Sequence, residues 1–274
     1  MIIWLASYPK SGNTWVRLFL CSYLFLDSKT TSFSLNLIKN IPSFPNKKLF
    51  AAHGIKPKNF EDVAKSWLII QKKINSNNKV NFLKTHHSYV TLNQYSFTNK
   101  ENTIGAIHLV RDPRDVLISY SKHMNKTVDE TLKLITANNH VGYLDDTNIT
   151  GDIRGSWSLH YNTWKNFNLK EKIIIRYEDL INKPYENFHK IILYLNKLIK
   201  IKIDEKKIKR CIELTNFENL KKIENLNGFV EGNNKNVPFF NTGKYEQWKN
   251  CLDKKIISKI NREFENEMRE LKYI

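Results

Sequence analysis

Apolar residues along this chain follow two alternating patterns. Four short segments are rich in β-branched residues or continuously apolar, as buried parallel strands are, and they cover residues 2–6, 80–84, 104–110 and 172–176. Apolar residues recur at helical spacing over 15–26, 116–124, 157–167, 185–198 and 256–271. Strands that alternate with helices in this way predict an α/β fold, with a mainly parallel central sheet and helices on both of its faces.

Two long segments, 27–79 and 125–155, are polar and lack a strong periodicity. We interpret both as insertions that shape a substrate cleft, and the second as partly mobile. The sequence shows no internal repeat and no second apolar unit. The 274 residues are therefore predicted to form a single domain spanning 1–274.

A chemically suggestive residue follows each of the four predicted strands. Lys10 follows the first strand and His86 the second, while Arg111 follows the third and Tyr177 the fourth. Parallel α/β sheets bind their ligands beyond the carboxyl ends of the strands. We therefore expect these side chains to serve one site.

The turn after the first strand reads Ser-Tyr-Pro-Lys-Ser-Gly-Asn-Thr-Trp over residues 7–15 and leads into a helix. A strand, a tight turn and a helix start direct backbone N–H groups and the positive end of the helix dipole at one point, which suits a phosphate or a sulfate. The loop signature G-x-x-x-x-G-K-[ST] is not met, because Lys10 precedes Gly12. The turn is therefore predicted to be a phosphate-binding loop of another type, in which the lysine precedes the glycine.

The second strand ends in Lys84-Thr85-His86-His87. An imidazole with a pKa of about 6.5 is well matched to removing a proton from a hydroxyl or an amine. A lone histidine is more often structural, and here two histidines stand side by side. His86 and His87 are thus competing candidates for a general base.

The third block is Leu-Val-Arg-Asp-Pro-Arg-Asp-Val-Leu-Ile-Ser-Tyr over residues 109–120. Pro113 falls in the first turn of the predicted helix, where its missing N–H costs nothing. Arg111 can contact a phosphate bidentately, and Ser119 can add a hydroxyl. The alternative, an Arg111 that caps the helix beside Asp112, leaves Ser119 unexplained.

These blocks, in this order, resemble the sulfotransferases that use 3′-phosphoadenosine 5′-phosphosulfate (PAPS). The first resembles the family's P-K-S-G-T-T-W loop with Asn13 in place of the first Thr, the second its K-T-H, and the third its R-[DN]-P-[KR]-D-x-x-x-S-x-Y. Weaker matches are 177–180 to Y-E-D-L, 215–217 to T-S-F, and 241–250 to a late R-K-G-x-x-G-D-W-K-N loop. The resemblance implies a three-layer αβα sulfotransferase fold with a phosphate-loop-like site.

The resemblance also implies the reaction, which is transfer of a sulfuryl group from PAPS to a hydroxyl or amine with release of adenosine 3′,5′-bisphosphate (PAP). His86 would be the base, with His87 turned outward or toward the acceptor rim, and Lys10 and Lys84 would stabilise developing charge. Trp15 would contact adenine, with a place in the core as the alternative. The implied cofactor-binding residues are Lys10, Ser11, Gly12, Asn13, Thr14, Trp15, Arg111, Ser119, Tyr177, Thr215, Phe217, Gly243 and Lys244.

The sequence departs from the family pattern at two places. Asn241 and Thr242 stand where the family has Arg-Lys, so two cations expected near the 3′-phosphate are missing and Lys244 is the candidate to compensate. His87-Ser88 stands where Leu-Pro usually follows, which leaves the acceptor open. The chain offers no clear carboxylate pair for Mg²⁺, so we expect no metal.

A net charge of +17, from 44 Lys and Arg against 27 Asp and Glu, favours polyanionic ligands. The lysines are spread throughout the chain, so we interpret much of the excess as solvated surface and expect no nucleic-acid partner. The charge mildly favours a sugar or other polar acceptor. Two other classes stay open: a phosphate-loop nucleotide or polynucleotide kinase, which predicts metal and ATP use, and a noncatalytic binder of anionic ligands, which predicts salt-sensitive binding without turnover.

The remaining features concern where the protein acts. Its three cysteines are isolated, the first predicted strand begins at residue 2, and the best apolar run, 15–26, contains Arg17 and is too short to cross a bilayer. These features predict a cytoplasmic protein with no membrane span. They do not indicate an oligomeric state.

Overall fold

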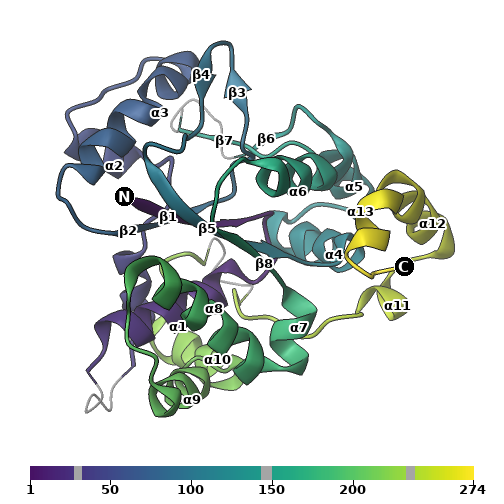
Figure 1. The fold of residues 1–274 in the computed structure, drawn as a ribbon. Helices are drawn as coiled ribbons and strands as arrows, with labels where there is room; N and C mark the ends of the chain where they lie inside the picture. Colours follow the sequence, from purple (N-terminus) through teal and green to yellow (C-terminus); the bar gives the residue numbers. More distant parts are fainter. Residues whose placement is uncertain (28–32, 143–149, 233–237) are drawn as a thin grey trace.

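A four-stranded parallel sheet lies at the centre of the protein (Figure 1). The computed structural model describes residues 1–27, 33–142, 150–232 and 238–274. The strands run in the order β2 (Asn81–Thr85), β1 (Ile2–Ser7), β5 (Thr103–Val110) and β8 (Lys172–Arg176). All three pairings are parallel, so the carboxyl ends of the strands meet at one edge of the sheet. The four predicted strands are confirmed to within one or two residues.

The central strand β1 is buried on both of its faces. Ile3 and Leu5 point into one hydrophobic cluster, while Ile2, Trp4 and Ala6 point into another. Successive side chains of a strand face opposite sides, so a strand between two helical layers is apolar at every position. This is why residues 2–6 read as a continuous apolar run.

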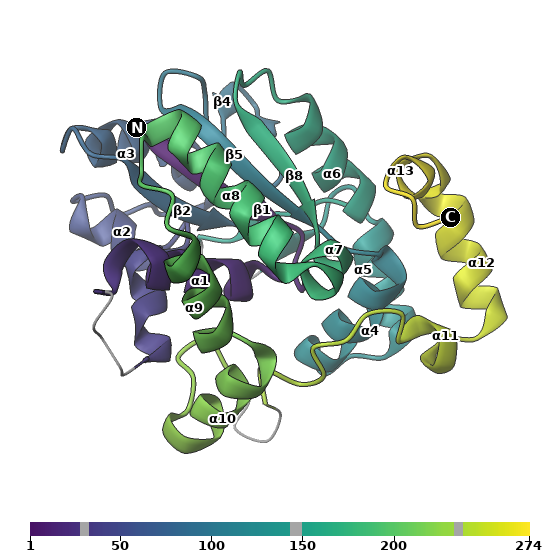
Figure 2. The ribbon, with the colours of Figure 1, turned by 60° about the horizontal axis from the view of Figure 1, so that its bottom comes forward.

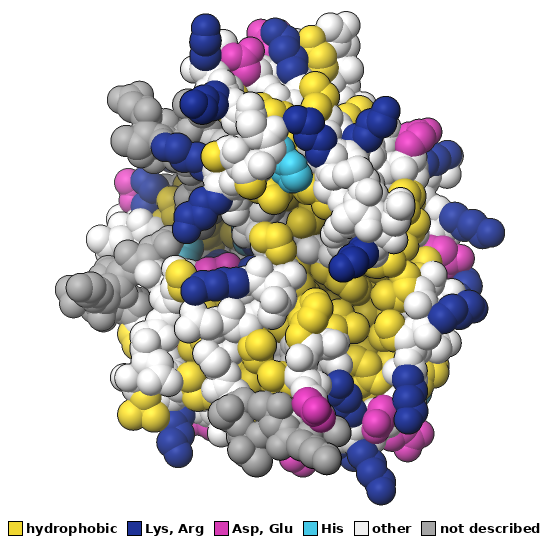
Figure 3. All heavy atoms as spheres, turned by 90° about the vertical axis from the view of Figure 1, so that its left-hand side faces the viewer, with side chains coloured by type: hydrophobic (Ala, Val, Ile, Leu, Met, Phe, Trp, Pro, Cys, Tyr) yellow, Lys and Arg dark blue, Asp and Glu magenta, His cyan; other side chains and the backbone are white. Residues whose placement is uncertain are grey.

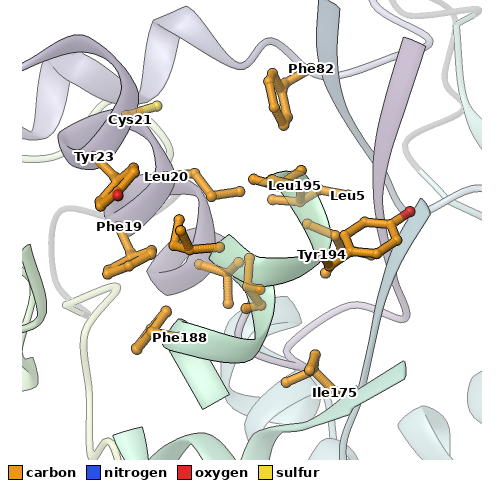
Figure 4. Packing of buried hydrophobic residues seen from close by; sticks show 14 of the residues in the cluster. Leu5, Phe19, Leu20, Cys21, Tyr23, Phe82, Ile175, Phe188, Tyr194 and Leu195 are labelled. Atoms are coloured by element: carbon orange, nitrogen blue, oxygen red, sulfur yellow. The ribbon is translucent and has the colours of Figure 1, made fainter. Parts of the chain in front are cut away.

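Helices α1 (Asn13–Phe25), α8 (Pro184–Ile199) and α9 (Glu205–Leu214) cover the first face (Figure 2). Phe19 of α1 stacks on Phe188 of α8 with ring centroids 4.0 Å apart, between the two helices seen in Figure 4. Burying side chains of this size contributes about 1.5–3 kcal/mol each. This layer holds the start of α1 against the end of β1.

The second face is covered by α3 (Phe60–Asn75) and α6 (Trp157–Asn166). Trp164 of α6 lies 6.3 Å from Trp4 of β1, ring centroid to ring centroid. Trp67 of α3 belongs to the same cluster and is fully buried. The three-layer αβα arrangement predicted from the sequence is confirmed.

Helix α3 contradicts our prediction that 27–79 is irregular. Its buried residues Val63, Trp67, Ile70 and Ile74 recur at helical spacing. The side chain of Asn59 caps its N-terminus by accepting from the backbone N–H of Asp62. The sequence therefore carried the signal, but charged residues between the apolar positions masked it.

The segment 125–155 also contains regular structure, contrary to prediction. Helix α5 (Val128–Thr136) begins with a capping box in which the side chains of Thr127 and Glu130 bond each other's backbone N–H groups. Strands β6 (Val141–Gly142) and β7 (Asp152–Ile153) form an antiparallel pair. Residues 143–149, where mobility was predicted in part, lie outside the described residues.

The predicted helix over 256–271 is two helices, α12 (Lys254–Glu263) and α13 (Glu265–Glu270). Phe264 separates them and packs 5.1 Å from Trp157, centroid to centroid. No helix among the described residues is both long and apolar enough to cross a membrane. The other elements are η1 (Leu35–Asn40), α2 (Lys47–Ala52), β3 (Thr91–Leu92), β4 (Tyr95–Ser96), α4 (Pro113–Met124), α7 (Tyr177–Asn182), α10 (Phe217–Asn227) and α11 (Trp248–Cys251).

The basic side chains are distributed over the surface. On the face shown in Figure 3, Lys and Arg side chains are scattered among acidic ones, around a hollow with apolar side chains. A further basic strip on α12 consists of Lys254, Lys255, Lys259 and Arg262. Such a distribution is typical of a solvated surface as well as of a weak general attraction for anions.

Candidate active site

A cavity of about 570 Å³ lies at the carboxyl ends of the parallel strands. The four residues that follow the strands, Lys10, His86, Arg111 and Tyr177, all line it. They are far apart in the sequence, and only the parallel pairing of the strands brings them together. The structure thus places them in the wall of one site.

Most of the residues singled out from the sequence line the same cavity. Ser11 and Lys244 do not line it. Ser11 is fully buried, and Lys244 accepts a hydrogen bond from Arg111 through its backbone carbonyl oxygen rather than presenting its side chain. The hydroxyl of Ser11 has no hydrogen-bond partner among the described residues. The predicted residues in the wall are Lys10, Gly12, Asn13, Thr14, Trp15, Lys84, His86, Arg111, Ser119, Tyr177, Thr215, Phe217 and Gly243.

The turn before α1 has a backbone that only certain residues adopt. Gly12 has φ 88° and Lys10 has φ 66°, both in the left-handed region. A Cβ on Gly12 would lie 2.6 Å from Cδ2 of Tyr177, so any side chain there would displace the tyrosine ring. Glycine is therefore required for the close approach of the loop and the ring.

The N-terminus of α1 has no side-chain cap and no acidic residue in its first turn. The first N–H groups of a helix have no partner within the helix, and the helix dipole makes that end positive. Gly12, Asn13 and Thr14 at this end line the cavity. The arrangement is suited to an anion such as a phosphate.

Two lysines add positive charge to the cavity wall. Burial lowers the pKa of Lys10 to about 8, helped by the positive charge of Arg111. Burial also lowers the pKa of Lys84 to about 8, while Asp152 and Glu231 act in the opposite direction. An anion bound between the two ammonium groups would favour their charged forms and raise both pKa values.

His86 is held in one tautomer. Its Nδ1 lies 2.8 Å from the backbone carbonyl oxygen of Ser7. A carbonyl oxygen can only accept, so Nδ1 carries the proton and Nε2 has a free lone pair. Burial, together with the charge of Lys84, lowers the pKa of His86 well below its usual value. The imidazole is therefore neutral at pH 7 and can accept a proton at Nε2.

His87 occupies the opposite side of the strand end, inside the core. It is fully buried, and its ring stacks on Phe97 with centroids 4.2 Å apart. Trp67 of α3 packs against the ring edge-on. The expectation that His87 points outward or to the acceptor rim is wrong, because α3, which we did not predict, covers that side of the sheet.

Asn13 connects the phosphate loop with His86. Its side-chain amide donates to the carbonyl oxygen of Leu5 at 3.2 Å and to Oγ of Ser7 at 3.1 Å. The same Oγ lies 3.2 Å from Nδ1 of His86. Asn13, where the loop departs from the family pattern, is therefore hydrogen-bonded to Ser7, and Ser7 in turn holds the imidazole of His86.

Arg111 bridges two loops across the cavity. Its guanidinium donates to the carbonyl oxygens of Lys10 at 3.0 Å and Lys244 at 2.9 Å. It also lies 4.4 Å from the ring centroid of Tyr177. Its Nε has no partner among the described residues, so a donor remains for a ligand.

The late loop is anchored by Asp115 of α4. The carboxylate accepts from the backbone N–H groups of Glu246 at 2.6 Å and Trp248 at 3.2 Å. Burial raises the pKa of Asp115, while the charge of Arg111 lowers it. The loop therefore keeps its place beside Arg111 although Asn241 and Thr242 lack the cationic side chains of the family pattern.

Trp15 borders both the cavity and the hydrophobic core, and its predicted contact with adenine stays a prediction. It lines the cavity, and it also packs edge-on against Phe188 of α8 with centroids 5.3 Å apart. The ring of Tyr177 lies 6.4 Å from the indole, centroid to centroid. Trp15 therefore contacts core residues and forms part of the cavity wall.

Several cavity residues were missed at the sequence level. Lys122 and His123 lie on α4, three and four residues after Ser119, so helical spacing could have found them. Glu231 and Phe239 lie in a segment without any motif. No local signal marks that segment.

The two supposed insertions contribute little to the cavity. Among the described residues, Ser43 is the one lining residue from 27–79, and none comes from 125–155. Our prediction that they shape a substrate cleft is supported by Ser43 alone among the described residues, and residues 28–32 and 143–149 lie outside them. The rest of the wall comes from the residues that follow the strands, from α1 and α4, and from α9, α10 and the chain after them.

The described residues contain no group of three or more His, Cys, Asp and Glu side chains that could hold a metal ion. The cavity wall carries Lys10, Lys84, Lys122, Arg111, His86, His123 and Glu231. Such side chains can bind an anion, stabilise charge and exchange a proton.

A family model for the sulfotransferase domain matches residues 2–272. The amine sulfotransferase of Oryctolagus cuniculus is 23% identical over 99% of this chain and 83% of its own length. The flavonol 3-sulfotransferase of Flaveria bidentis is 24% identical over 95% of this chain and 79% of its own length. The chain belongs to the sulfotransferase family and is an enzyme of that class.

Solved structures share the fold. A mouse sulfotransferase complexed with PAP matches with a TM-score of 0.62 and 18% identity, over 98% of this chain and 84% of its own. A retinol dehydratase in complex with androsterone and the inactive cofactor PAP matches with a TM-score of 0.62 and 16% identity, over 97% of this chain and 80% of its own. These similarities agree with the three-layer fold described above.

Proposed function

We propose that this PAPS-dependent sulfotransferase transfers the sulfuryl group to a hydroxyl of its acceptor within the cavity at the sheet edge, with release of PAP. One observation carries the proposal: an uncapped helix N-terminus, Lys10, Arg111 and a neutral His86 line the same cavity. The first three suit the anionic donor, and the last suits the acceptor. An amine acceptor would use the same groups.

We assign the donor to the side of the cavity nearest α1 and α4. The N–H groups from Ser11 to Thr14 suit the 5′-phosphate, while Arg111 and Ser119 suit the 3′-phosphate. Tyr177, Trp15 and Phe217 offer aromatic faces to adenine; a Cβ on Gly243 would lie 2.4 Å from Cδ2 of Phe217, so glycine is needed beside that ring as well. Lys122 lines the cavity one turn beyond Ser119 and supplies positive charge that Asn241 and Thr242 do not.

The proposed reaction is an in-line displacement at sulfur. The acceptor oxygen forms a bond to sulfur, the bond from sulfur to the bridging oxygen of PAPS breaks, and Nε2 of His86 takes the acceptor proton. Lys10 and Lys84 neutralise the charge that develops on the leaving phosphate oxygen. Positioning and charge stabilisation supply most of the acceleration.

Nucleotide selectivity tests the donor site. PAP is expected to raise the melting temperature far more than AMP or ATP, because a ligand stabilises the state that binds it. Arg111→Ala should weaken PAP binding by about 1.5–3 kcal/mol, the range for a hydrogen bond to a charged group. The matched control is Arg176→Ala, which removes an arginine at the end of β8 that does not line the cavity. Equal shifts with AMP and PAP would contradict the assignment.

Lys10→Ala should lower turnover more than it weakens PAP binding. Its proposed work is on charge that appears only in the transition state, so its loss costs kcat rather than affinity. Single-turnover kinetics with saturating PAPS, beside PAP titration, would separate the two. Weakened binding with intact turnover at saturation would make Lys10 an anchor and nothing more.

A further inference from the structure

Glu231 places a carboxylate in the wall of the cavity, in a segment without any recognisable motif. Its two oxygens accept from Nη1 of Arg17 at 2.8 and 3.1 Å. The side chain of Arg17 is 2% exposed, whereas that of Glu231 is 30% exposed. The carboxylate of Glu231 is thus fixed by a buried arginine, while its exposed part can accept further hydrogen bonds.

Arg17 is itself fixed in place. Its Nη2 donates to the carbonyl oxygens of Ile38 at 3.3 Å and Ile41 at 2.7 Å. It lies on α1, the helix whose N-terminus forms the phosphate loop. The position of Glu231 is therefore set relative to the donor site by a buried, multiply bonded arginine, although 214 residues separate the pair.

The polar character continues around the proposed base. Ser43 and Lys84 also line the cavity, together with His86. An apolar acceptor would cover these groups without bonding them, and each buried polar group left unpaired costs about 1–3 kcal/mol. A sugar hydroxyl can donate to a carboxylate and accept from an ammonium group, so a polyhydroxylated acceptor satisfies both.

The positive charges near Glu231 already have partners in the reacting complex. Arg17 is paired with Glu231, and the bound anionic donor neutralises Lys10 and Lys84. The carboxylate of Glu231 therefore remains as a hydrogen-bond acceptor for a hydroxyl of the acceptor substrate.

We propose that Glu231, oriented by Arg17, recognises a sugar acceptor by accepting a hydrogen bond from a hydroxyl other than the one that is sulfated. This rests on the proposed function, since it presumes that His86 lies at the transfer site. Glu231 is then a specificity-determining residue. A purely structural role, in which Glu231 only neutralises Arg17, is the alternative that an experiment must separate.

The test compares acceptors and variants. Transfer of ³⁵S from PAPS is measured with a panel of methyl glycosides and disaccharides, and with p-nitrophenol and a steroid alcohol as single-hydroxyl acceptors. For the wild type, kcat/KM with the best glycoside is expected to exceed that with p-nitrophenol by about 100-fold or more, since a site built to bond a hydroxyl rejects acceptors that lack it.

Glu231→Gln keeps an oxygen for Arg17 but removes the charge that the acceptor hydroxyl meets. It should lower kcat/KM for the glycoside by roughly 10- to 100-fold, mainly through KM, as expected for loss of a charged hydrogen bond. The PAP-induced thermal shift should not change. Transfer to p-nitrophenol should fall much less than transfer to the glycoside, because it loses only the small effect that the charge of Glu231 has on the pKa of Lys84. The control is Glu171→Gln, whose carboxylate instead pairs with Lys197 at 2.9 Å and does not line the cavity. It should not alter the preference between acceptors.

The paired variant Arg17→Met with Glu231→Leu removes both charges, a change that buried ion pairs often tolerate. It should retain the PAP-induced shift and lose the preference for the glycoside. The inference is overturned if no glycoside is sulfated, if the phenol or steroid is preferred, or if Glu231→Gln lowers kcat/KM equally for every acceptor. Absence of any PAP-induced shift in the wild type would instead remove the proposed function, and this inference with it.

Discussion

Replacing His86 with alanine is expected to lower turnover by roughly 10²–10⁴-fold, the usual worth of a general base. The PAP-induced thermal shift should change little, because the proposed role of His86 is to accept the acceptor proton rather than to bind the donor. The structure supports this role through the Nδ1 proton, which the carbonyl oxygen of Ser7 holds and which leaves Nε2 free. Steady-state kinetics at saturating PAPS would measure the effect.

His87→Ala is the matched control, because the two histidines are adjacent. His87 is stacked on Phe97 in the core, so its loss should lower the free energy of unfolding by about 1–3 kcal/mol and leave kcat of the folded enzyme near normal. A variant at His87 that folds normally but has no turnover, beside an active His86→Ala, would reverse our assignment. If neither change affects turnover, the acceptor proton goes to another group.

Lowering the pH from 7 to 5 is expected to destabilise the folded protein by several kcal/mol. Burial lowers the pKa of His87 to about 4 and that of His108 to about 3, and that of His160 well below its usual value. In the unfolded chain each has a pKa of about 6.5. The unfolded state therefore binds protons first, and stability falls as the pH drops below about 6.5.

The size of the effect follows from linkage. For each such histidine the free energy of unfolding falls by about 1.4 kcal/mol per pH unit below the pKa of the unfolded state. His87 and His108 therefore each lower the free energy of unfolding by about 2 kcal/mol at pH 5. Burial raises the pKa values of Asp115 and Glu178, which opposes this trend at lower pH, so the comparison stops at pH 5. Urea unfolding at the two pH values measures the difference.

His108→Gln provides the control for the acid effect. Glutamine keeps a polar group at the site but cannot gain a proton, so the fall in stability between pH 7 and pH 5 should shrink by about 2 kcal/mol. A wild type equally stable at both pH values would contradict the prediction. If neither His108→Gln nor His87→Ala reduces the loss of stability at pH 5, other titratable groups cause that loss.

The sequence by itself determined the features that local chemistry controls. The strands, the phosphate loop around Gly12 and the helix start at Pro113 were predictable, because apolar periodicity and turn residues act over short stretches. The order of the motifs indicated the family. The rule that parallel strands present ligands at their carboxyl ends led to Lys10, His86 and Arg111 before any contact was known.

Only the tertiary structure decided where His87 lies. The resemblance implied His86 as the base but put His87 outward or at the acceptor rim, whereas α3 packs over that side of the sheet and buries His87. Glu231 is held in the cavity wall by its ion pair with Arg17, which lies 214 residues away in the sequence, and no local pattern predicts this contact. Local structure depends on neighbouring residues, whereas the cavity wall depends on which distant segments pack against each other.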